Sequence, residues 1–444
     1  MKILLITLSA RGHAIADAFA RSSHHPDIIH ICPQRNPGIR KLASEQHCVD
    51  SLMNFAAILD ITKKAKPDFA FIAPDDPIGG GLADALEAIG IRSIAPKKSL
   101  ARIESSKGFA RELIQKHAIG GNPRFRVFHR GADSSALRDY IEGELHGQYV
   151  VKFDGLLGGK GVKVGGEHLA FVDDGVAYAQ ECLTSADQVV IEEKLTGVEF
   201  SLMSFVSGGR VVSMPAVQDH KRAFEDDTGP NTGGMGSYSD ANHSLPFLEP
   251  SNIAEAHDYN VAAAHALQTE CGEPYCGILY GGFIATADGI RLIEYNARFG
   301  DPESLNVLPI LQSDFVDVCQ SMLTGELNTN CVQFMERATV CLSITPNCYP
   351  ESKDRQGEIV QFPTEIPQNA RIYFGDVSED HDGTLRLGGS RTAGIVGIGA
   401  SIEEARRVAL SICEKVEGPV RFRRDIGTKE LLQKRVDTMR RLRA

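Results

Sequence analysis

One stretch of the sequence, from Gln218 to Gly236, limits what the surrounding chain can fold into. It begins with Gln218-Asp219-His220-Lys221-Arg222 and ends with Asp227-Thr228-Gly229-Pro230-Asn231-Thr232-Gly233-Gly234-Met235-Gly236. The second part is so rich in glycine and proline that it can neither fill a core nor continue a helix. Glycine lets backbone N–H groups approach an anion closely, and a solvated surface loop is the ordinary alternative. The stretch is therefore either a mobile loop or part of an anion-binding site.

The composition indicates an ordinary globular chain of several domains. Its 444 residues are too many for one core and suggest about three domains of ~150 residues. The formal net charge of −11 argues against nucleic-acid and membrane-surface binding, because both favour a basic face. No apolar run approaches the ~20 residues that span a bilayer. The ten cysteines form no C-x-x-C pair, which predicts reduced thiols, a cytoplasmic location and no structural zinc.

The first hundred residues alternate between strand and helix patterns. We expect strands at Lys2–Thr7, Ile28–Cys32 and Phe69–Ala73, helices at His13–Arg21 and Phe55–Ala65, and turns at Leu8–Gly12 and Pro74–Pro77. This alternation predicts a parallel, Rossmann-like sheet, and such sheets bind ligands at the carboxyl ends of their strands. Both turns would lie at that edge. Two ordinary turns without a ligand are the alternative.

The rest of the chain mixes helices with antiparallel strand signals. We expect a helix at Ser105–His117, strands at Tyr149–Phe153 and Val189–Glu193, a hairpin of Glu199–Val206 with Arg210–Ala216, and a hairpin of Ile278–Ala285 with Gly289–Tyr295. From about Ala338 the chain is again rich in strands and contains an amphipathic helix, Ile402–Val416. This last part has no cluster of convergent charges and is typical of a small capping domain.

Two lysines flank a glycine-rich loop. Lys152 lies on the strand Tyr149–Phe153, and Lys160 follows Gly158-Gly159. Backbone donors and flexible cations in this arrangement can close over the phosphates of a nucleoside triphosphate. The spacing fits neither the Walker A loop nor the dinucleotide fingerprint, and a solvated hairpin is an equally good interpretation.

Acidic residues follow at two strand ends. Glu192-Glu193-Lys194-Leu195, with Glu199, could hold an adenine edge and ribose hydroxyls. Glu294 and Asn296 alternate on one strand and share a face, and two hard oxygen ligands suit Mg²⁺. Arg298 on the same face could grip a phosphoryl or carboxylate group. Each of these features alone could be structural.

Taken in order, these residues resemble a known superfamily. The succession Lys107, Lys152, Lys160, Glu192–Leu195, Glu199, Glu294 and Asn296 is similar to that of ATP-grasp enzymes. The segments Gln218–Arg222, Thr228–Gly236 and Asn296–Glu303 closely resemble the phosphoribosylamine–glycine ligase (glycinamide ribonucleotide synthetase) family. The resemblance runs from Met1 to about Lys429, where Arg423-Arg424-Asp425-Ile426-Gly427 resembles the family's closing motif.

The resemblance implies an α/β and α+β architecture with an ATP-grasp fold. Its parts would be an N-terminal Rossmann-like domain (residues 1–102), an ATP-grasp domain (103–335) with a lid at about 120–195, and a small C-terminal capping domain (336–435). The implied reaction is ATP-dependent ligation of glycine to 5-phosphoribosylamine through glycyl phosphate, the second step of de novo purine biosynthesis. The implied partners are small molecules, with ATP and Mg²⁺ or Mn²⁺, in a monomer or weak homodimer.

The resemblance also implies site residues. ATP would be bound by Lys107, Lys152, Lys160, Glu192, Lys194, Leu195 and Glu199, and the metal by Glu294 and Asn296. Substrates would be held by Arg11, His13, Asp75, Asp219, Arg298 and Asp301, and catalysis would involve Asp219, His220, Lys221 and Arg298. His220 is either a proton acceptor for the attacking amine or a structural histidine.

The chain departs from the family pattern at two turns. The family's Gly-Arg-x-His-Ala pattern corresponds here to a segment that keeps Arg11 and His13 but carries glycine at Gly12, and Asp75-Asp76-Pro77 replaces Pro-Glu-Ala-Pro. The ligands of the phosphoribosylamine phosphate are therefore left open. Another ATP-grasp ligase or carboxylase, or a silent paralogue, is the alternative function. The presence of Lys152, Glu294, Asn296 and Arg298 disfavours the silent paralogue.

Overall fold

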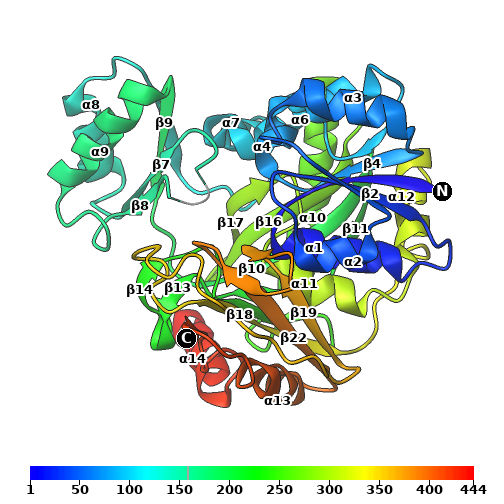
Figure 1. The fold of residues 1–444 in the computed structure, drawn as a ribbon. Helices are drawn as coiled ribbons and strands as arrows, with labels where there is room; N and C mark the ends of the chain where they lie inside the picture. Colours follow the sequence, from blue (N-terminus) through cyan, green and yellow to red (C-terminus); the bar gives the residue numbers. More distant parts are fainter. Residues whose placement is uncertain (158–159) are drawn as a thin grey trace.

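The computed structural model describes residues 1–157 and 160–444. The chain forms a large body and a smaller lobe, residues 124–194, which projects to the left in Figure 1 and which we call the lid. The lid encloses a hydrophobic core of its own around Ile141, Tyr149 and Ile191. The main core of the body, in contrast, includes Leu4 from the N-terminal part and Ile395 from the C-terminal part. The body is therefore one packed unit to which the lid is attached.

The N-terminal part of the body is a five-stranded parallel sheet in the order β3-β2-β1-β4-β5, which confirms the predicted α/β unit. Its elements are β1 (Lys2–Ile6), α1 (Ser9–Ala20), β2 (Asp27–Cys32), α2 (Pro37–Leu42), β3 (Glu45–Cys48), α3 (Phe55–Ala65), β4 (Phe69–Ile72), α4 (Asp75–Gly80), α5 (Leu82–Glu87) and β5 (Ser93–Ile94). The expected turn at Leu8–Gly12 is wrong, because α1 already begins at Ser9. Gly12 permits this early start, since a Cβ there would lie 2.1 Å from Thr7 Oγ1. Asp75 likewise begins a helix instead of lying in a turn.

The middle of the body is an antiparallel sheet in the order β11-β10-β16-β17. Its elements are α6 (Lys98–Ser105), α7 (Lys107–Lys116), β10 (Val198–Ser207), β11 (Arg210–Ser213), α10 (Pro250–Cys271), β16 (Cys276–Thr286), β17 (Gly289–Asn296), α11 (Glu303–Val307), η3 (Leu308–Ile310) and α12 (Phe315–Thr324). Both predicted hairpins are present, as β10–β11 and β16–β17. The carboxyl end of β17 lies beside the base of the lid, where Lys152 Nζ donates to the Ile293 carbonyl over 2.8 Å.

The lid is an antiparallel sheet in the order β6-β9-β7-β8, with helices α8 and α9 against it (Figure 1). Its elements are β6 (Phe125–His129), α8 (Ser134–Asp139), η1 (Tyr140–Glu144), β7 (Tyr149–Phe153), β8 (Val162–Val164), α9 (Val172–Ser185) and β9 (Gln188–Glu193). The two lid strands expected from the sequence are β7 and β9. The chain enters and leaves the lid once.

The C-terminal sheet includes two strands from the middle of the chain, β12 and β15. Its order is β12-β15-β18-β22-β19, with β23 beside β18. The elements of this region are β12 (Gln218–Asp219), β13 (Arg222–Phe224), η2 (Glu225–Asp227), β14 (Thr228–Asn231), β15 (Gly236–Ser239), β18 (Ala338–Pro346), β19 (Ala370–Phe374), β20 (Val377–Glu379), β21 (Leu385–Leu387), β22 (Ala393–Gly399), α13 (Ile402–Cys413), β23 (Val420–Arg421) and α14 (Lys429–Arg443). The stretch from Gln218 to Gly236 is therefore not one mobile loop: it contributes a sheet strand and a small hairpin.

Two further expectations concern the whole chain. All ten cysteines are free thiols, as their spacing predicts. Across residues 1–157 and 160–444, no helix is long and apolar enough to cross a bilayer.

Candidate active site

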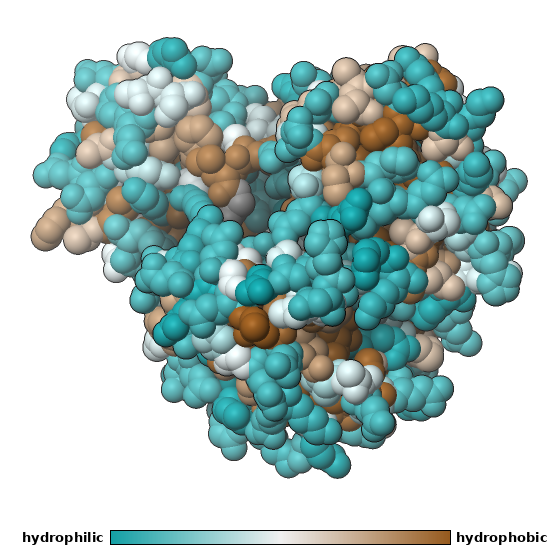
Figure 2. Space-filling view, in the orientation of Figure 1, coloured by the Kyte–Doolittle hydropathy of each residue, from teal (hydrophilic) through white to brown (hydrophobic). Residues whose placement is uncertain are grey.

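A cavity beneath the lid brings together three residues predicted to bind ATP or metal. It lies between α7 and β17 and is lined by Lys107, Lys152 and Glu294 among others. Figure 2 shows the surface hollowed between the lid and the body. Lys107 stands in the first turn of α7, and its Nζ donates to the Gly155 carbonyl over 2.8 Å. The lysine is thereby held against the start of the glycine-rich loop.

Lys152 is buried in an ionic triad at the base of the lid. Its Nζ lies 2.6 Å from Glu192 Oε1, and Arg111 Nε lies 2.8 Å from Glu192 Oε2. Burial lowers the pKa of Lys152, and Glu192 offsets part of this effect. For Glu192, burial acts to raise the pKa, but Arg111 and Lys152 outweigh it and lower the value. Both oxygens of Glu192 are thus engaged by cations, so its carboxylate orients Lys152 in this structure and does not face an open ribose site.

The other residues predicted for ATP are not among those that line this cavity. Lys194 Nζ lies 3.1 Å from Glu167 Oε1. Leu195 is half-buried and Glu199 is exposed, with Glu199 Oε2 3.2 Å from Lys221 Nζ. Lys160 is exposed in a turn. The Gly158-Gly159 pair of the predicted phosphate loop falls outside the described residues.

Glu294 and Asn296 point to the same side of β17. Arg298 connects to this face, because its Nη2 donates to Asn296 Oδ1 over 3.0 Å. Burial acts to raise the pKa of Glu294, but Lys221, Lys107 and Lys152 outweigh it and lower the value. The surrounding lysines thus favour the charged form of Glu294, and among the described residues no hydrogen-bond donor contacts its carboxylate. A carboxylate and an amide oxygen on one face fit a hard divalent cation.

Arg298 is held in place by Glu104, an acid that no sequence motif singles out. Its Nη2 lies 3.0 Å from Glu104 Oε1, and Ala297 N–H donates to Glu104 Oε2 over 2.8 Å. Burial opposes the charge on Arg298, but Glu104 and Asp75 outweigh it and raise its pKa. The guanidinium stays charged while buried, as recognition of an anionic substrate requires.

Two carboxylates lie next to each other beside this arginine: Glu303 is buried, and Asp219 is half-buried with its Oδ1 atom shielded from solvent. Asp219 and Glu303 belong to different parts of the chain, and Tyr280 Oη donates to Glu303 Oε1 over 2.8 Å. Burial and the nearby Glu303 raise the pKa of Asp219 well above its ordinary value. Asp219 Oδ1 has no hydrogen-bond partner among the described residues. The pair is suited to a small cation, because a positive charge between the two acids would allow both to ionise.

Asp301 joins the N-terminal and C-terminal parts at the site. Ser9 Oγ donates to Asp301 Oδ2 over 2.8 Å, and Arg391 Nη1 lies 3.1 Å from Asp301 Oδ1. Arg11 is buried nearby, and its Nη1 donates to the Phe299 carbonyl over 2.7 Å. Burial and the charge of Arg298 lower the pKa of Arg11. Arg11, Arg298, Asp75 and Asp301 therefore form one charged cluster.

Two predicted site histidines lie outside this cluster. His13 accepts the Phe374 N–H at Nδ1 over 2.9 Å and stacks on the Phe374 ring. His220 is fully buried on the opposite face of its segment, with Nδ1 3.4 Å from Asp227 Oδ1. Burial lowers the pKa of both rings. In both rings the Nδ1 atom is thus engaged by the protein itself, and the roles predicted for His13 and His220 stay predictions.

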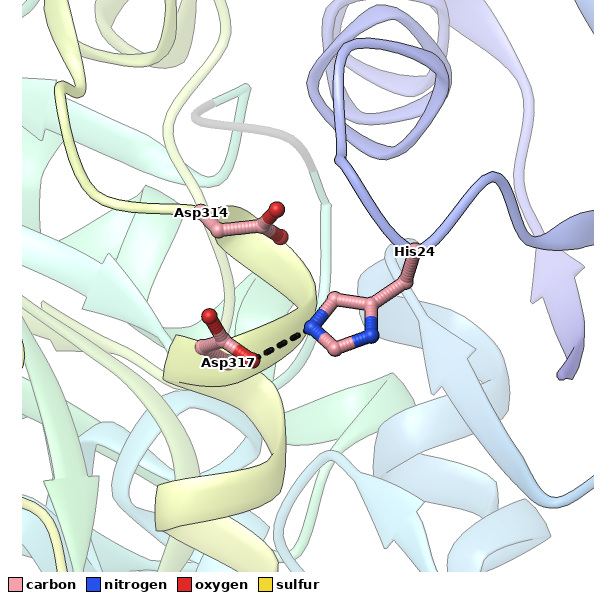
Figure 3. A group of neighbouring side chains, drawn as sticks. All are labelled: His24, Asp314 and Asp317. Carbon is pink, nitrogen blue, oxygen red and sulfur yellow. Dashed lines mark hydrogen bonds and ion pairs between the residues drawn. The ribbon is translucent and has the colours of Figure 1, made fainter.

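A separate group of possible metal ligands lies far from the cavity. Figure 3 shows His24, Asp314 and Asp317, with His24 Nε2 2.6 Å from Asp317 Oδ1. Asp314 caps α12 and accepts hydrogen bonds from Ser22, Ser23 and Val316. Because its oxygens already have partners, the group is a contact between α1 and α12.

Comparison with known families identifies the chain. Models of phosphoribosylglycinamide synthetase match the N domain at residues 1–104, the ATP-grasp (A) domain at 105–304 and the C domain at 339–429. The chain belongs to the phosphoribosylamine–glycine ligase family. The phosphoribosylamine–glycine ligases of Methanococcus maripaludis and Methanosarcina barkeri are each 42% identical to it, with 100% of both chains covered.

Solved structures agree with membership of this family. The phosphoribosylamine–glycine ligase of Thermotoga maritima is 28% identical, with a TM-score of 0.78 over 96% of this chain and 100% of that chain. A biotin carboxylase of Campylobacter jejuni, 13% identical, has a TM-score of 0.74 over 99% of this chain and 98% of its own, which shows a shared fold alone. The predicted ATP-grasp fold is thereby confirmed.

The phosphoribosylamine–glycine ligase motifs alone gave no role to Glu104, Arg111, Glu303 or Arg391. Arg111 follows Lys107 by one helical turn in α7, and that spacing could have pointed to it. Glu303 is the last residue of Asn296–Glu303, a segment that already resembles a family motif. Glu104 and Arg391 had no local signal, because each acts through a partner distant in the sequence.

Proposed function

We propose that the chain is a phosphoribosylamine–glycine ligase that joins glycine to 5-phosphoribosylamine and converts ATP to ADP and phosphate. The observation that carries the assignment is the pair of neighbouring acids, half-buried Asp219 and buried Glu303, beside Arg298. An acidic pair and an arginine close together suit a small zwitterion whose ammonium meets the acids and whose carboxylate meets the arginine. This pocket adjoins the lysine-lined cavity, so a bound carboxylate would lie near the terminal phosphate of ATP.

The first step is activation of glycine. A carboxylate oxygen of glycine attacks the γ-phosphorus, and the bond to ADP breaks, which gives glycyl phosphate. Lys107 and Lys152 spread the negative charge that develops on the phosphate oxygens. Glu294 and Asn296 would hold Mg²⁺ or Mn²⁺, which supplies further charge neutralisation when bound. Arg298 orients the carboxylate for attack.

The second step forms the amide. The amine nitrogen of 5-phosphoribosylamine attacks the carbonyl carbon of glycyl phosphate, phosphate leaves, and the nitrogen loses a proton. Arg11, Asp75 and Asp301 lie at the carboxyl edge of the parallel sheet and are our candidates for holding the ribosyl substrate. The lid covers the intermediate and limits its hydrolysis. His13 positions α1 through its contact with Phe374.

Phosphate release tests the assignment. ATP-dependent release should require glycine and freshly made phosphoribosylamine together, and glycinamide ribonucleotide should accumulate in equal amount. Bicarbonate in place of glycine distinguishes the carboxylase alternative. Absence of release with both substrates, or release with bicarbonate, contradicts the proposal.

A further inference from the structure

Asp227, which lies between Gln218 and Gly236, is the centre of a partly buried ionic network. Arg423 Nη1 lies 3.0 Å from Asp227 Oδ1, and Arg435 of α14 pairs with its other oxygen. His220 Nδ1 approaches the same Oδ1 at 3.4 Å. Arg423 is 1% exposed, so its charge would be costly to bury without these partners. Within residues 1–157 and 160–444, no hydrogen bond or ion pair joins the side chains of Asp227, Arg423 or Arg435 to the acids proposed to bind glycine.

The network is hydrogen-bonded to the chain segment directly after Asp219 and Lys221. Arg423 Nη1 donates to the Arg222 carbonyl over 3.1 Å, and its Nη2 lies 2.6 Å from Asp425 Oδ2. The same Asp425 oxygen accepts the Asp226 N–H over 3.0 Å. The family's closing motif near the C-terminus is therefore attached directly to the chain that follows β12.

The alternation of side chains connects this network to the active site. Asp219 and Lys221 flank His220 and point toward the acidic pocket and Glu199, whereas His220 points into the network. The His220 N–H donates to the Gly236 carbonyl over 2.9 Å, and its carbonyl accepts from Met235 N–H over 2.8 Å. A shift of this strand pairing by one residue would turn the side chains of Asp219 and Lys221 to the face now occupied by His220. Both side chains would then leave the acidic pocket.

We propose that His220, Asp227, Arg423 and Arg435 are positioning residues that set the register of Asp219 and Lys221 for binding glycine. The assignment rests on the proposed function. The network holds His220 from the side opposite the substrate, so it acts on glycine through its two sequence neighbours. Its effect on glycine acts through Asp219, whose side chain lies beside Glu303.

Two substitutions of His220 separate positioning from proton transfer. In His220→Asn the amide nitrogen occupies the place of Nδ1 and can still donate to Asp227, whereas His220→Leu fills the space without a donor. We expect His220→Leu to raise the KM for glycine about tenfold with the KM for ATP unchanged, and His220→Asn to restore it to about the wild-type value. Equal loss of kcat in both variants with unchanged KM values would show proton transfer and overturn the proposal.

Arg435→Gln tests the network at its partly exposed end, with Arg440→Gln, on an exposed position of the same helix, as the matched control. Amide hydrogen exchange over residues 218–222 should accelerate about tenfold in Arg435→Gln and remain unchanged in the control. This readout needs no turnover, so it stands even if the wild-type enzyme fails to release phosphate, a result that would contradict only the proposed function. Unchanged exchange in Arg435→Gln, or lower thermal stability with an unchanged KM for glycine, would overturn the proposal.

Discussion

Glu104 fixes Arg298 from across the domain boundary: its Oε1 lies 3.0 Å from the guanidinium, and its other oxygen accepts the Ala297 N–H over 2.8 Å. One buried carboxylate of α6 thereby holds both the backbone and the side chain at the end of β17. Burial raises the pKa of Glu104, and Arg298 counteracts this.

Glu104→Gln should impair catalysis more than folding. The amide oxygen can still accept the Ala297 N–H, but Arg298 loses its ionic partner and its fixed direction. We expect kcat/KM for glycine to fall about 10-fold to 100-fold, as a small misplacement can cause. Steady-state phosphate release measures the effect, and Glu112→Gln, on an exposed position of α7, is the control. Equal activity of the two variants would argue that Arg298 needs no such support.

Lys152→Met should weaken binding of ATP without unfolding the lid. Glu192 keeps its pair with Arg111, so no buried acid is left alone, while the cation that faces the phosphates is lost. The KM for ATP should rise at least about tenfold. Lys116→Met, which removes an exposed lysine from α7, should leave it unchanged. Wild-type affinity for ATP in Lys152→Met would place the phosphates elsewhere.

Glu294→Ala should abolish turnover and leave the far-ultraviolet circular dichroism unchanged. The substitution removes the carboxylate among Lys107, Lys152 and Lys221 that fits a divalent cation. Asp288→Asn, at the other end of the same hairpin, serves as the control. Activity that persists in Glu294→Ala at high Mg²⁺ concentration would remove Glu294 from the metal site.

Asp219→Asn should separate stability from activity. Because Glu303 and burial already raise the pKa of Asp219, replacing it with a neutral amide relieves repulsion between the two acids. We expect an unchanged or higher Tm together with loss of glycine-dependent phosphate release, a trade-off typical of functional sites. A marked fall in Tm would instead assign the acid a structural role.

His13 should make folding sensitive to pH. Burial lowers its pKa to about 4 from 6.5, so between these values the unfolded chain binds a proton that the folded chain does not. Stability therefore falls as the pH decreases through this window, by at most about 3 kcal/mol from this ring. His13→Asn, whose Oδ1 can accept the Phe374 N–H, should lose that part of the dependence in urea unfolding at pH 5 and pH 7.5. His146→Asn, in an exposed turn, should retain it.

The sequence predicts best where a pattern is local. The hairpins β10–β11 and β16–β17 and the parallel strands β1, β2 and β4 follow from strand periodicity and turn residues. The edge strand β3 was missed because Glu45–Cys48 has no apolar alternation. The start of α1 differs from the expected turn because Gly12 lies inside the helix, where it allows close packing on Thr7.

The directions of the site's side chains were harder to predict from the sequence than the strands and helices that carry them. His220 shares a motif with Asp219 and Lys221, but a residue between two active neighbours on extended chain points the other way. Glu104 and Arg391 depend on contacts with residues about 190 and 90 positions away, which no local pattern encodes.

The carboxylate of Asp301 contacts Ser9, near the start of the chain, and Arg391, in its C-terminal part. These contacts affect the order in which the protein can fold during synthesis. A nascent chain cannot complete these contacts until Arg391 has left the ribosome, so no shorter intermediate forms the whole charged cluster around Asp301. Both partners of Asp301 lie outside the lid. The two ends of the chain therefore act as one unit at this site and must be inherited together.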